Sequence, residues 1–559
     1  MGQNLIEISV RDSIIWRDGE TVWCDGPGVN WYSESVIRLS NEDYSDRRYW
    51  SDDIISYTPP QFSIAGATGG YCRMDFGNIE LTLNVFAGKS KTSGNALFTD
   101  SDVVWLDGET EWIDDALVSG DPTLWPPPRE INLRHQYTET DEAGLVLTFV
   151  GTGHLATFDR ESVHYDLYGD KYDTDLLKEV VNYDGDTVTL PLALGAVHYV
   201  TPVRQADVGG FPVYHKGGLS GALAVEVASI ADNGSGKARF TTSIAHGFTN
   251  LDTVTVEVSN PASTYNTTQI ATVIDGTHFD FPLIAYVDDL GGHSFKTGYW
   301  RIYDDGVPIS GNATDNVDGT FTLDTTNVGN VSISGTGTIT TLSDLLTYLS
   351  TNLDPALSYT YDAALEGTSP TISYWADSQQ LLVDFVSEVA KYFETLFYIS
   401  NSTIYAVAMD KTNGTRTLTE YDFFPVTYDY PTPISLLKAE WATREAGEWV
   451  DGGKYVKSTD EEETVTSGYP YGSEENVTPY QYVRAGITTR LASLLTAKHK
   501  CQVQLSIPMS DSLPVPGEQL TYTDESSFTD ALDVTMFCRN LIYNFDQDTV
   551  VITGDGVLT

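Results

Sequence analysis

One eight-residue pattern in the sequence has residue types that could do chemistry, and it occurs twice. Residues 16–23 are WRDGETVW and residues 105–112 are WLDGETEW, so both copies share W-x-D-G-E-T-x-W. Two tryptophans beside two carboxylates could bind a sugar, or could cleave a glycosidic bond if one carboxyl group acts as an acid. The same residues also suit a β-hairpin tip, because Asp-Gly favours the positive φ angles of tight turns.

A β-hairpin explains this pattern better than a glycosidase site, because it needs no special placement of the two carboxyl groups. A glycosidase holds its two carboxyl groups about 5–10 Å apart across the substrate, and one of them needs a raised pKa. Asp18 and Glu20 are two residues apart at an exposed tip, where nothing would desolvate either group. In a hairpin, Trp16 and Thr21 would be cross-strand neighbours with Trp23 further along, and each aromatic pair would contribute about 0.5–1 kcal/mol. The residues kept as candidates for contact with a partner or a sugar are Trp16, Trp23, Trp105 and Trp112.

Other catalytic or metal-binding patterns are missing from the sequence. The nine histidines show no H-x-H or H-x-x-x-H spacing, and the four cysteines form no C-x-x-C pair. The stretch DKYDTD at 170–175 resembles a calcium loop only loosely, because it lacks the glycine and the distal glutamate. No phosphate-binding or nucleophile-elbow pattern occurs. We therefore expect a protein that is not an enzyme and has no catalytic residue, cofactor or metal.

The charge of the chain excludes some classes of partner. There are 79 acidic and 31 basic residues, which gives a net charge of -48. Binding of nucleic acid or of an anionic membrane depends on lysine and arginine, so neither is expected. No stretch approaches the roughly 20 apolar residues of a membrane span, and the first residues lack the apolar run of a signal peptide. These features predict a soluble protein made in a cytoplasm.

Alternation of apolar and polar residues dominates the chain and predicts a mainly β fold. NLIEISV, LVLTFVG, CQVQLSI and DTVVITG have the period of half-buried strands, and Asp-Gly or Asn-Gly pairs recur between such stretches. A helical period is convincing only over 341–349, 378–397 and 485–500, with Asp377 or Ser378 as the N-cap of the second helix. We expect several β-barrel or β-sandwich domains with a few packing helices, α+β in the middle and C-terminal parts.

Shifts in composition predict five domains and one long loop. The acidic and polar stretch 458–476 is expected to be an exposed loop, and an arm that contacts a partner is the alternative. The predicted domains are an N-terminal β domain with both W-x-D-G-E-T-x-W hairpins (1–205), a small inserted β module (206–297), a mixed β/α segment (298–375), a helix-plus-strands middle domain (376–430) and a C-terminal β-barrel with a helix (431–559).

Residues 245–282 resemble a small β module that is common in tail proteins of tailed bacteriophages. The matching positions are His246-Gly247-Phe248, Tyr265-Asn266, and Asp275 with Phe279. Such modules are usually ornaments or interaction domains without catalysis. The resemblance therefore implies that His246 is a turn residue.

Two further regions resemble baseplate and tail-tip hub proteins of tailed phages. In 186–234 the matching positions are Gly195-Ala196-Val197, Val200-Thr201-Pro202-Val203 and Tyr214, with Leu190-Pro191 where hub-like proteins often have Lys-Pro. In the C-terminal part, LASLLTAKHKCQVQLSIP, Pro516-Gly517 and residues 534–558 resemble the closing barrel of a hub. The helix of 378–397, followed by FYISNSTIYAVAM, is similar to the middle part of a hub. The order of these matches is stronger evidence than any one of them.

The resemblance implies a structural component of a phage tail tip or baseplate, located in the virion and assembled in the host cytoplasm. It implies a homotrimeric ring that closes the tail tube and contacts the distal tail protein, the tape measure protein and a tail fibre or spike. An acidic channel would let DNA pass during ejection without binding it, because like charges repel. The alternatives are a receptor- or carbohydrate-binding tail protein that uses the four motif tryptophans, and a tail-associated glycosidase or lyase.

Overall fold

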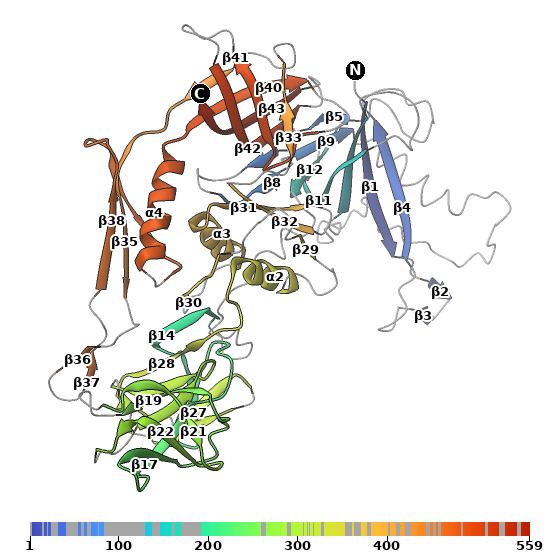
Figure 1. Ribbon diagram of the computed structural model, residues 1–559. Helices are drawn as coiled ribbons and strands as arrows, with labels where there is room; N and C mark the ends of the chain where they lie inside the picture. The colour runs from blue at the N-terminus through green and yellow to red at the C-terminus, as the bar shows by residue number, and fades with distance from the viewer. Residues whose placement is uncertain are drawn as a thin grey trace.

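The computed structural model shows a mainly β protein whose sheets are joined by helices, as the sequence predicts (Figure 1). The structure describes residues 3–13, 16–18, 21–23, 32–40, 54–57, 61–63, 69–75, 78–82, 129–136, 146–158, 162–168 and 192–558, the last range without 259–263, 288–291, 306, 310, 312, 317, 326–328, 353–359, 363–369, 377–381, 401–402, 410–413, 420–425, 443–447, 451–453, 457–459, 482–483, 509–512, 525–531 and 545–548. Within these residues, no helix is long and apolar enough to cross a membrane.

A seven-stranded antiparallel sheet forms the N-terminal part of the molecule, in the order β4-β1-β10-β11-β12-β9-β5. The strands are β1 Gln3–Ser13, β4 Tyr32–Ser40, β5 Ile54–Tyr57, β9 Asn78–Thr82, β10 Arg129–Gln136, β11 Val146–Phe158 and β12 Ser162–Tyr168. A separate ribbon, β2 Trp16–Asp18 with β3 Thr21–Trp23, lies between β1 and β4 in the chain.

A lobe at the bottom of Figure 1 contains two four-stranded sheets that share one core. The first sheet contains β14 Ala196–Val200, β28 Val331–Thr336, β24 Arg301–Asp304 and β25 Val307–Pro308, and the second contains β15 Arg204–Val208, β16 Phe211–His215, β27 Thr320–Leu323 and β26 Ala313–Asp315. Trp300, Phe321 and Ile333 are fully buried in the core between them. Buried positions often follow one another along these strands, as at 212–215 in β16, so burial here is not strictly one-sided.

Residues 225–296 of the same lobe form a closed β-barrel with a core of its own, which we call the barrel module. Its strands are β17 Val225–Asp232, β18 Lys237–Thr242, β19 Thr253–Val258, β20 Thr267–Ile270, β21 Thr272–Val273, β22 His278–Ala285 and β23 Gly292–Lys296. The sheet order begins with β20 and ends with β21, which are separated only by Ala271. These two strands therefore act as one bent strand that joins both sheet edges, so no edge is left for aggregation. Phe240, Phe279 and Phe281 fill the interior.

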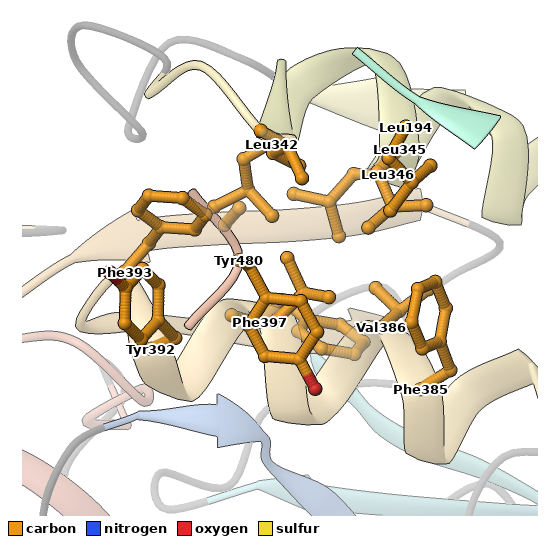
Figure 2. Close-up of a cluster of buried hydrophobic side chains, with 14 of the residues drawn as sticks. Leu194, Leu342, Leu345, Leu346, Phe385, Val386, Tyr392, Phe393, Phe397 and Tyr480 are labelled. Atoms are coloured by element: carbon orange, nitrogen blue, oxygen red, sulfur yellow. The ribbon is translucent and has the colours of Figure 1, made fainter. Parts of the chain in front are cut away.

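Helices and short strands pack together in the middle of the molecule. The elements are α2 Leu342–Asn352, α3 Leu382–Tyr392, β13 Leu192–Leu194 with β30 Tyr374–Ala376, and the sheet of β29 Thr360–Asp362, β32 Thr403–Ala408, β31 Thr395–Ser400 and β7 Gly70–Tyr71. Figure 2 shows Leu342, Leu345 and Leu346 of α2 facing side chains of α3 and its neighbours. Apolar residues at i, i+3 and i+4, leucines in α2 and mainly valines and Phe385 in α3, give each helix the apolar face that this core buries.

The second predicted helix, 378–397, extends too far at its C-terminal end. The described part of this helix ends at Tyr392, and β31 begins at Thr395. Glu394 adopts a left-handed conformation with φ 51°, and its amide donates to the carbonyl of Lys391, so the chain turns there. The expected N-cap, Asp377 or Ser378, lies outside the described residues.

The C-terminal part contains an eight-stranded sheet and a three-stranded sheet that packs against a helix. The larger sheet has β33 Thr415–Thr417, β41 Gln519–Asp524, β42 Leu532–Asn544, β43 Thr549–Leu558, β40 Cys501–Pro508 and β34 Thr427–Asp429, and β6 Gln61–Ser63 and β8 Arg73–Asp75 extend it at β42. The smaller sheet has β38 Asp460–Thr466, β35 Ile434–Ala442 and β39 Ser473–Val477, with α4 Arg484–Lys498 beside it and the ribbon β36 Glu448–Val450 with β37 Lys454–Val456 beyond it. The strands predicted over CQVQLSI and DTVVITG are confirmed by β40 and β43.

Candidate functional site

The first W-x-D-G-E-T-x-W copy forms the predicted hairpin, but with a different register. β2 and β3 pair antiparallel, with Trp16 opposite Trp23 and Asp18 opposite Thr21. The expectation that Trp16 would face Thr21 is wrong, because the connection between the strands is only residues 19–20. Residues directly opposite each other in a ribbon share one face, so the two tryptophan positions lie on the same face.

The other candidate residues of this kind lie outside the described residues. These are the second copy at 105–112, with Trp105 and Trp112, the calcium-like stretch at 170–175, and Glu20 of the first copy. The partner or sugar contact assigned to the four tryptophans stays a prediction. In the described residues, no group of three histidine, cysteine, aspartate or glutamate side chains is placed to hold a metal ion.

The acidic stretch 458–476 was expected to be an exposed loop, and most of it forms strands instead. β38 pairs antiparallel with β35, from Leu436 opposite Thr466 to Ala442 opposite Asp460, and β39 pairs with β35 in parallel. The alternation of Thr464, Val465 and Thr466 was the signal for a strand, and the density of acidic residues concealed it. Segments of high charge can still form strands when one face packs on a helix.

Helix α4 provides that packing and also neutralises part of the acidic charge. Leu437 and Ala439 of β35 are buried in one cluster with Ile487 and Leu491 of α4. The guanidinium of Arg484 lies 2.8 Å from the carboxylate of Glu463. At the other end of α4, the ammonium of Lys498 lies 2.5 Å from the carboxylate of Glu475. Both pairs are partly exposed, so they contribute little beyond fixing how the helix lies on the sheet.

An N-terminal excursion ties the first part of the chain to the last. We use this name for residues 61–75, which lie between β5 and β9, two strands that pair with each other. Within the excursion, β6 pairs with β42 of the C-terminal sheet and β7 pairs with β31 of the middle sheet. The amide of Cys72 donates to the carbonyl of Phe397 at 2.7 Å, and the amide of Tyr71 donates to the hydroxyl of Ser387 at 2.9 Å.

Two glycines make the close approach of this excursion possible. Gly69 and Gly70 have φ angles of 104° and 103°, which side chains rarely adopt. A Cβ on Gly69 would lie 2.5 Å from the carbonyl oxygen of Thr395, and one on Gly70 would lie 2.8 Å from the Ser387 hydroxyl. The Gly-Gly-Tyr-Cys stretch is therefore a docking element of the fold, which the sequence analysis missed.

A buried ion pair lies next to this excursion in the C-terminal sheet. Arg539 occupies the extra position of a β-bulge in β42, and its guanidinium lies 2.7 Å from the carboxylate of Asp555 on β43. Bulges redirect a side chain in this way. Both side chains are less than 5% exposed, and burial raises the pKa of Asp555 to about 6 despite the attraction of Arg539. The Cys72 thiol donates to the carbonyl of Arg539 at 3.4 Å, so the excursion covers the bulge.

A second buried polar cluster joins the barrel module to the sheet of β24. Glu257 of β19 accepts hydrogen bonds from His293 Nε2 at 2.7 Å, from the Tyr303 hydroxyl at 2.9 Å and from the Arg301 guanidinium at 3.3 Å. Burial alone would raise the pKa of Glu257, but these three donors lower it to about 2. Burial lowers the pKa of His293, which is fully buried, so its ring is neutral when it donates. We call these four residues the Glu257 junction.

No local sequence pattern marks the Glu257 junction, because its members come from three strands. Only the tertiary fold brings them together. His246, in contrast, is a turn residue as expected, since its Nδ1 accepts a hydrogen bond from the amide of Phe248 at 2.9 Å. The Glu257 junction contains no serine, cysteine or lysine nucleophile. We therefore interpret it as a structural contact that holds the barrel module against the sheet of β24.

The comparisons with known proteins give weak structural likenesses. No protein-family model and no curated protein matches the chain. A 43 kDa prophage tail protein from Shewanella oneidensis aligns with a TM-score of 0.36 and 8% identity, over 97% of this chain and 96% of that one. A tail protein from Neisseria meningitidis aligns with a TM-score of 0.28 and 10% identity, over 64% of this chain and 97% of that one. A prophage tail protein from Listeria monocytogenes aligns with a TM-score of 0.25 and 13% identity, over 59% of this chain and 94% of that one. Identities and TM-scores this low transfer no function.

Proposed function

We propose that this chain is a structural protein of a phage tail tip, and more specifically a ring-forming baseplate hub. The observation that carries the proposal is the order of the hub-like and tail-module stretches along the sequence. In the structure, the stretch 245–282 lies in the separately closed barrel module, and 534–558 contains β42 and β43 of the C-terminal sheet. The stretch 245–282 therefore lies within one folded unit, whereas the described part of 186–234 runs from β13 through the two-sheet lobe into β17 of the module.

The buried charges support a structural role over an enzymatic one. In the described residues, two buried ionic groups are the Arg539–Asp555 pair, which joins the neighbouring strands β42 and β43, and the Glu257 junction, which joins the barrel module to β24. Perturbed pKa values are common at catalytic centres, but structural ion pairs produce them as well. Glu257 already accepts hydrogen bonds from three donors of its own chain, which fits a structural role. We propose that the protein is not an enzyme.

The negative charge of the chain suggests that a ring made from it would repel DNA. With a net charge of -48, a channel wall made by this chain would repel phosphates and provide no counterion-releasing contacts that slow passage. The partners of such a hub would be the distal tail protein, the tape measure protein and a fibre or spike. Within this proposal, the chain assembles in the host cytoplasm and resides in the virion.

The test is the native mass of the purified chain, measured by light scattering over a range of concentrations. A hub predicts a mass three times the 61.4 kDa of the chain, and imaging of that species should show a central opening. A chain that stays monomeric at every concentration and salt, and that also fails to trimerise with a distal tail protein present, would refute the ring.

A carbohydrate-binding tail protein is the second candidate, and one observation favours it. Trp16 and Trp23 occupy directly opposite positions on one face of a ribbon, where two aromatic rings could stack on a saccharide. A glycan array with the wild-type chain and with Trp23→Ala separates the candidates. Binding that Trp23→Ala abolishes would favour the carbohydrate function, whereas a hub should bind no glycan.

A further inference from the structure

Three exposed tyrosines gather at one corner of the molecule, where β35 and β39 begin and α4 ends. Tyr430, Tyr469 and Tyr471 are 67%, 53% and 99% exposed. Every other tyrosine whose burial the structure describes is buried or half-buried. We call these three residues the tyrosine corner. Large exposed aromatic groups that gather at one place are typical of surfaces that contact another molecule.

The backbone under the tyrosine corner is fixed by contacts between its two segments. The amide of Ser473 donates to the carbonyl of Pro433 at 3.0 Å. A Cβ on Gly472 would lie 2.5 Å from the carbonyl oxygen of Pro433, so a larger residue would not fit there. The turn that carries Tyr471 is therefore held against the segment that follows Tyr430. A surface that is already ordered loses little conformational entropy when it binds a partner.

The start of β40 brings the other two tyrosines to the same place. The ring of Tyr469 packs edge-on against the ring of His499, with 5.1 Å between their centroids. Two residues further along, the thiol of Cys501 donates to the carbonyl of Asp429 at 3.6 Å. Asp429 precedes Tyr430 in the chain, so Tyr430 and Tyr469 border the same short segment.

We propose that the tyrosine corner binds a basic, arginine-containing segment of another protein. The planar guanidinium of arginine stacks on aromatic rings and also pairs with carboxylates. A chain with a net charge of -48 attracts a basic partner over long distances, and the tyrosine rings would then fix where that partner lies. The inference does not rest on the proposed hub, because it needs no ring.

The charges beside the tyrosine corner are complementary to this partner. No lysine or arginine occurs in 427–433 or 467–476, the two segments that carry the tyrosines, and both Asp429 and Glu474 are exposed. Lys498 at the end of α4 is already paired with Glu475 at 2.5 Å. A second copy of this chain is a poor occupant in comparison, because two copies with the same net charge repel each other.

The test measures the binding of two synthetic peptides to the full chain by fluorescence anisotropy. Arginine alternates with glycine in one peptide, and lysine takes every arginine position in the other, so both carry the same charge. Measurements at about 0.5 M salt screen the general attraction between a polycation and an acidic chain. We expect the arginine peptide to bind at least about fivefold more tightly than the lysine peptide, because arginine stacks better on tyrosine.

The decisive variant is Tyr430→Ala/Tyr469→Ala/Tyr471→Ala, which should bind both peptides equally. The corresponding triple phenylalanine variant keeps the rings and should keep the preference for arginine. The matched control is Leu283→Ala, which removes a side chain that is 76% exposed on the barrel module and should change nothing. Circular dichroism checks the fold, and Tyr471→Ala alone replaces a triple variant that unfolds, with a smaller loss of preference expected.

Two outcomes would overturn the inference. The first is equal binding of both peptides by the wild-type chain, or an unchanged preference in the triple alanine variant. The second is self-association of the wild-type chain that the triple alanine variant abolishes, because the occupant would then be a second copy. A wild-type chain that stays monomeric but prefers the arginine peptide would refute the ring and support this inference, so the two proposals fail separately.

Discussion

Replacing Glu257 with alanine should loosen the junction between the barrel module and the rest of its lobe. The change removes the one acceptor that three donors share, His293, Tyr303 and Arg301. A hydrogen bond to a charged group contributes about 1.5–3 kcal/mol. Breaking a buried ion pair costs about 3–5 kcal/mol, and since Arg301 is 14% exposed, some water can reach its charge. We therefore expect a total loss of about 3–5 kcal/mol in the local free energy of unfolding.

Hydrogen exchange measured by mass spectrometry is the suitable assay, because a chain with several domains does not unfold in one step. A loss of this size should speed the exchange of amides in β19, β23 and β24 by about two to four powers of ten. The matched control is Lys296→Met, which breaks the more exposed ion pair of Lys296 with Asp252 near the other ends of β19 and β23. Exposed pairs contribute little, so its peptides should exchange almost as in the wild type. Equal acceleration in both variants, or none in Glu257→Ala, would refute this account of the junction.

The same junction should weaken in acid, and the sign follows from two pKa shifts. The pKa of Glu257 is lowered from its usual 4.5 to about 2, so its contribution is complete above pH 4.5 and is lost as the pH falls toward 2. The pKa of His293 is also lowered, because burial disfavours its charged form, so protonation of the unfolded state below pH 6.5 costs further stability. Thermal unfolding of Glu257→Gln should depend less on pH between these values than that of the wild type. An equal slope in both proteins would contradict the assignment.

Three further outcomes follow from the excursion, the buried ion pair and the lobe. Gly70→Ala should destabilise the chain by about 1–3 kcal/mol in urea unfolding, whereas Gly209→Ala, also at positive φ but with no atom within 4 Å of its Cβ, should cost less. The double variant Arg539→Met/Asp555→Leu should match or exceed wild-type stability at pH 8 by up to about 4 kcal/mol, because burial of this charge is costly; a large loss would contradict that. A fragment of residues 195–339 should show wild-type exchange protection in the barrel module, whose core lies wholly within 227–281; an unprotected module would refute its independence.

The parts of the fold that could be predicted are those whose signal lies within about ten residues. The strand at 501–508 is an example, because its alternating buried and more exposed positions match the alternation in its sequence. The first hairpin could also be predicted from Asp18-Gly19, although its register could not, because one residue more or less in the connection changes every partner. The end of α3 was misplaced since Thr395 and the aromatic residues after it suit either a helix face or a strand.

The candidate sites were less predictable because long-range pairing creates them. Glu257, His293 and Arg301 are 36 and 8 residues apart in the sequence and meet only through the pairing of β19 with β23 and the return of β24. The bulge that directs Arg539 toward Asp555 is likewise set by the register of two strands, which no composition reveals. For the stretch 458–476, charge density suggested a loop, and the missing information was a helix on one face of the sheet.

The arrangement of these contacts divides the described molecule into two structural parts. The excursion completes, with residues 61–75, a sheet built mainly from the last 60 residues, so the N- and C-terminal parts cannot separate without breaking that sheet. The chain, in contrast, enters and leaves the lobe at one place. There the amide of Gly195 donates to the carbonyl of Ile339 at 2.6 Å, and the amide of Gly337 donates to the carbonyl of Gly195. The lobe, with its module held to β24 through Glu257, is therefore joined to the rest of the described chain at this one place.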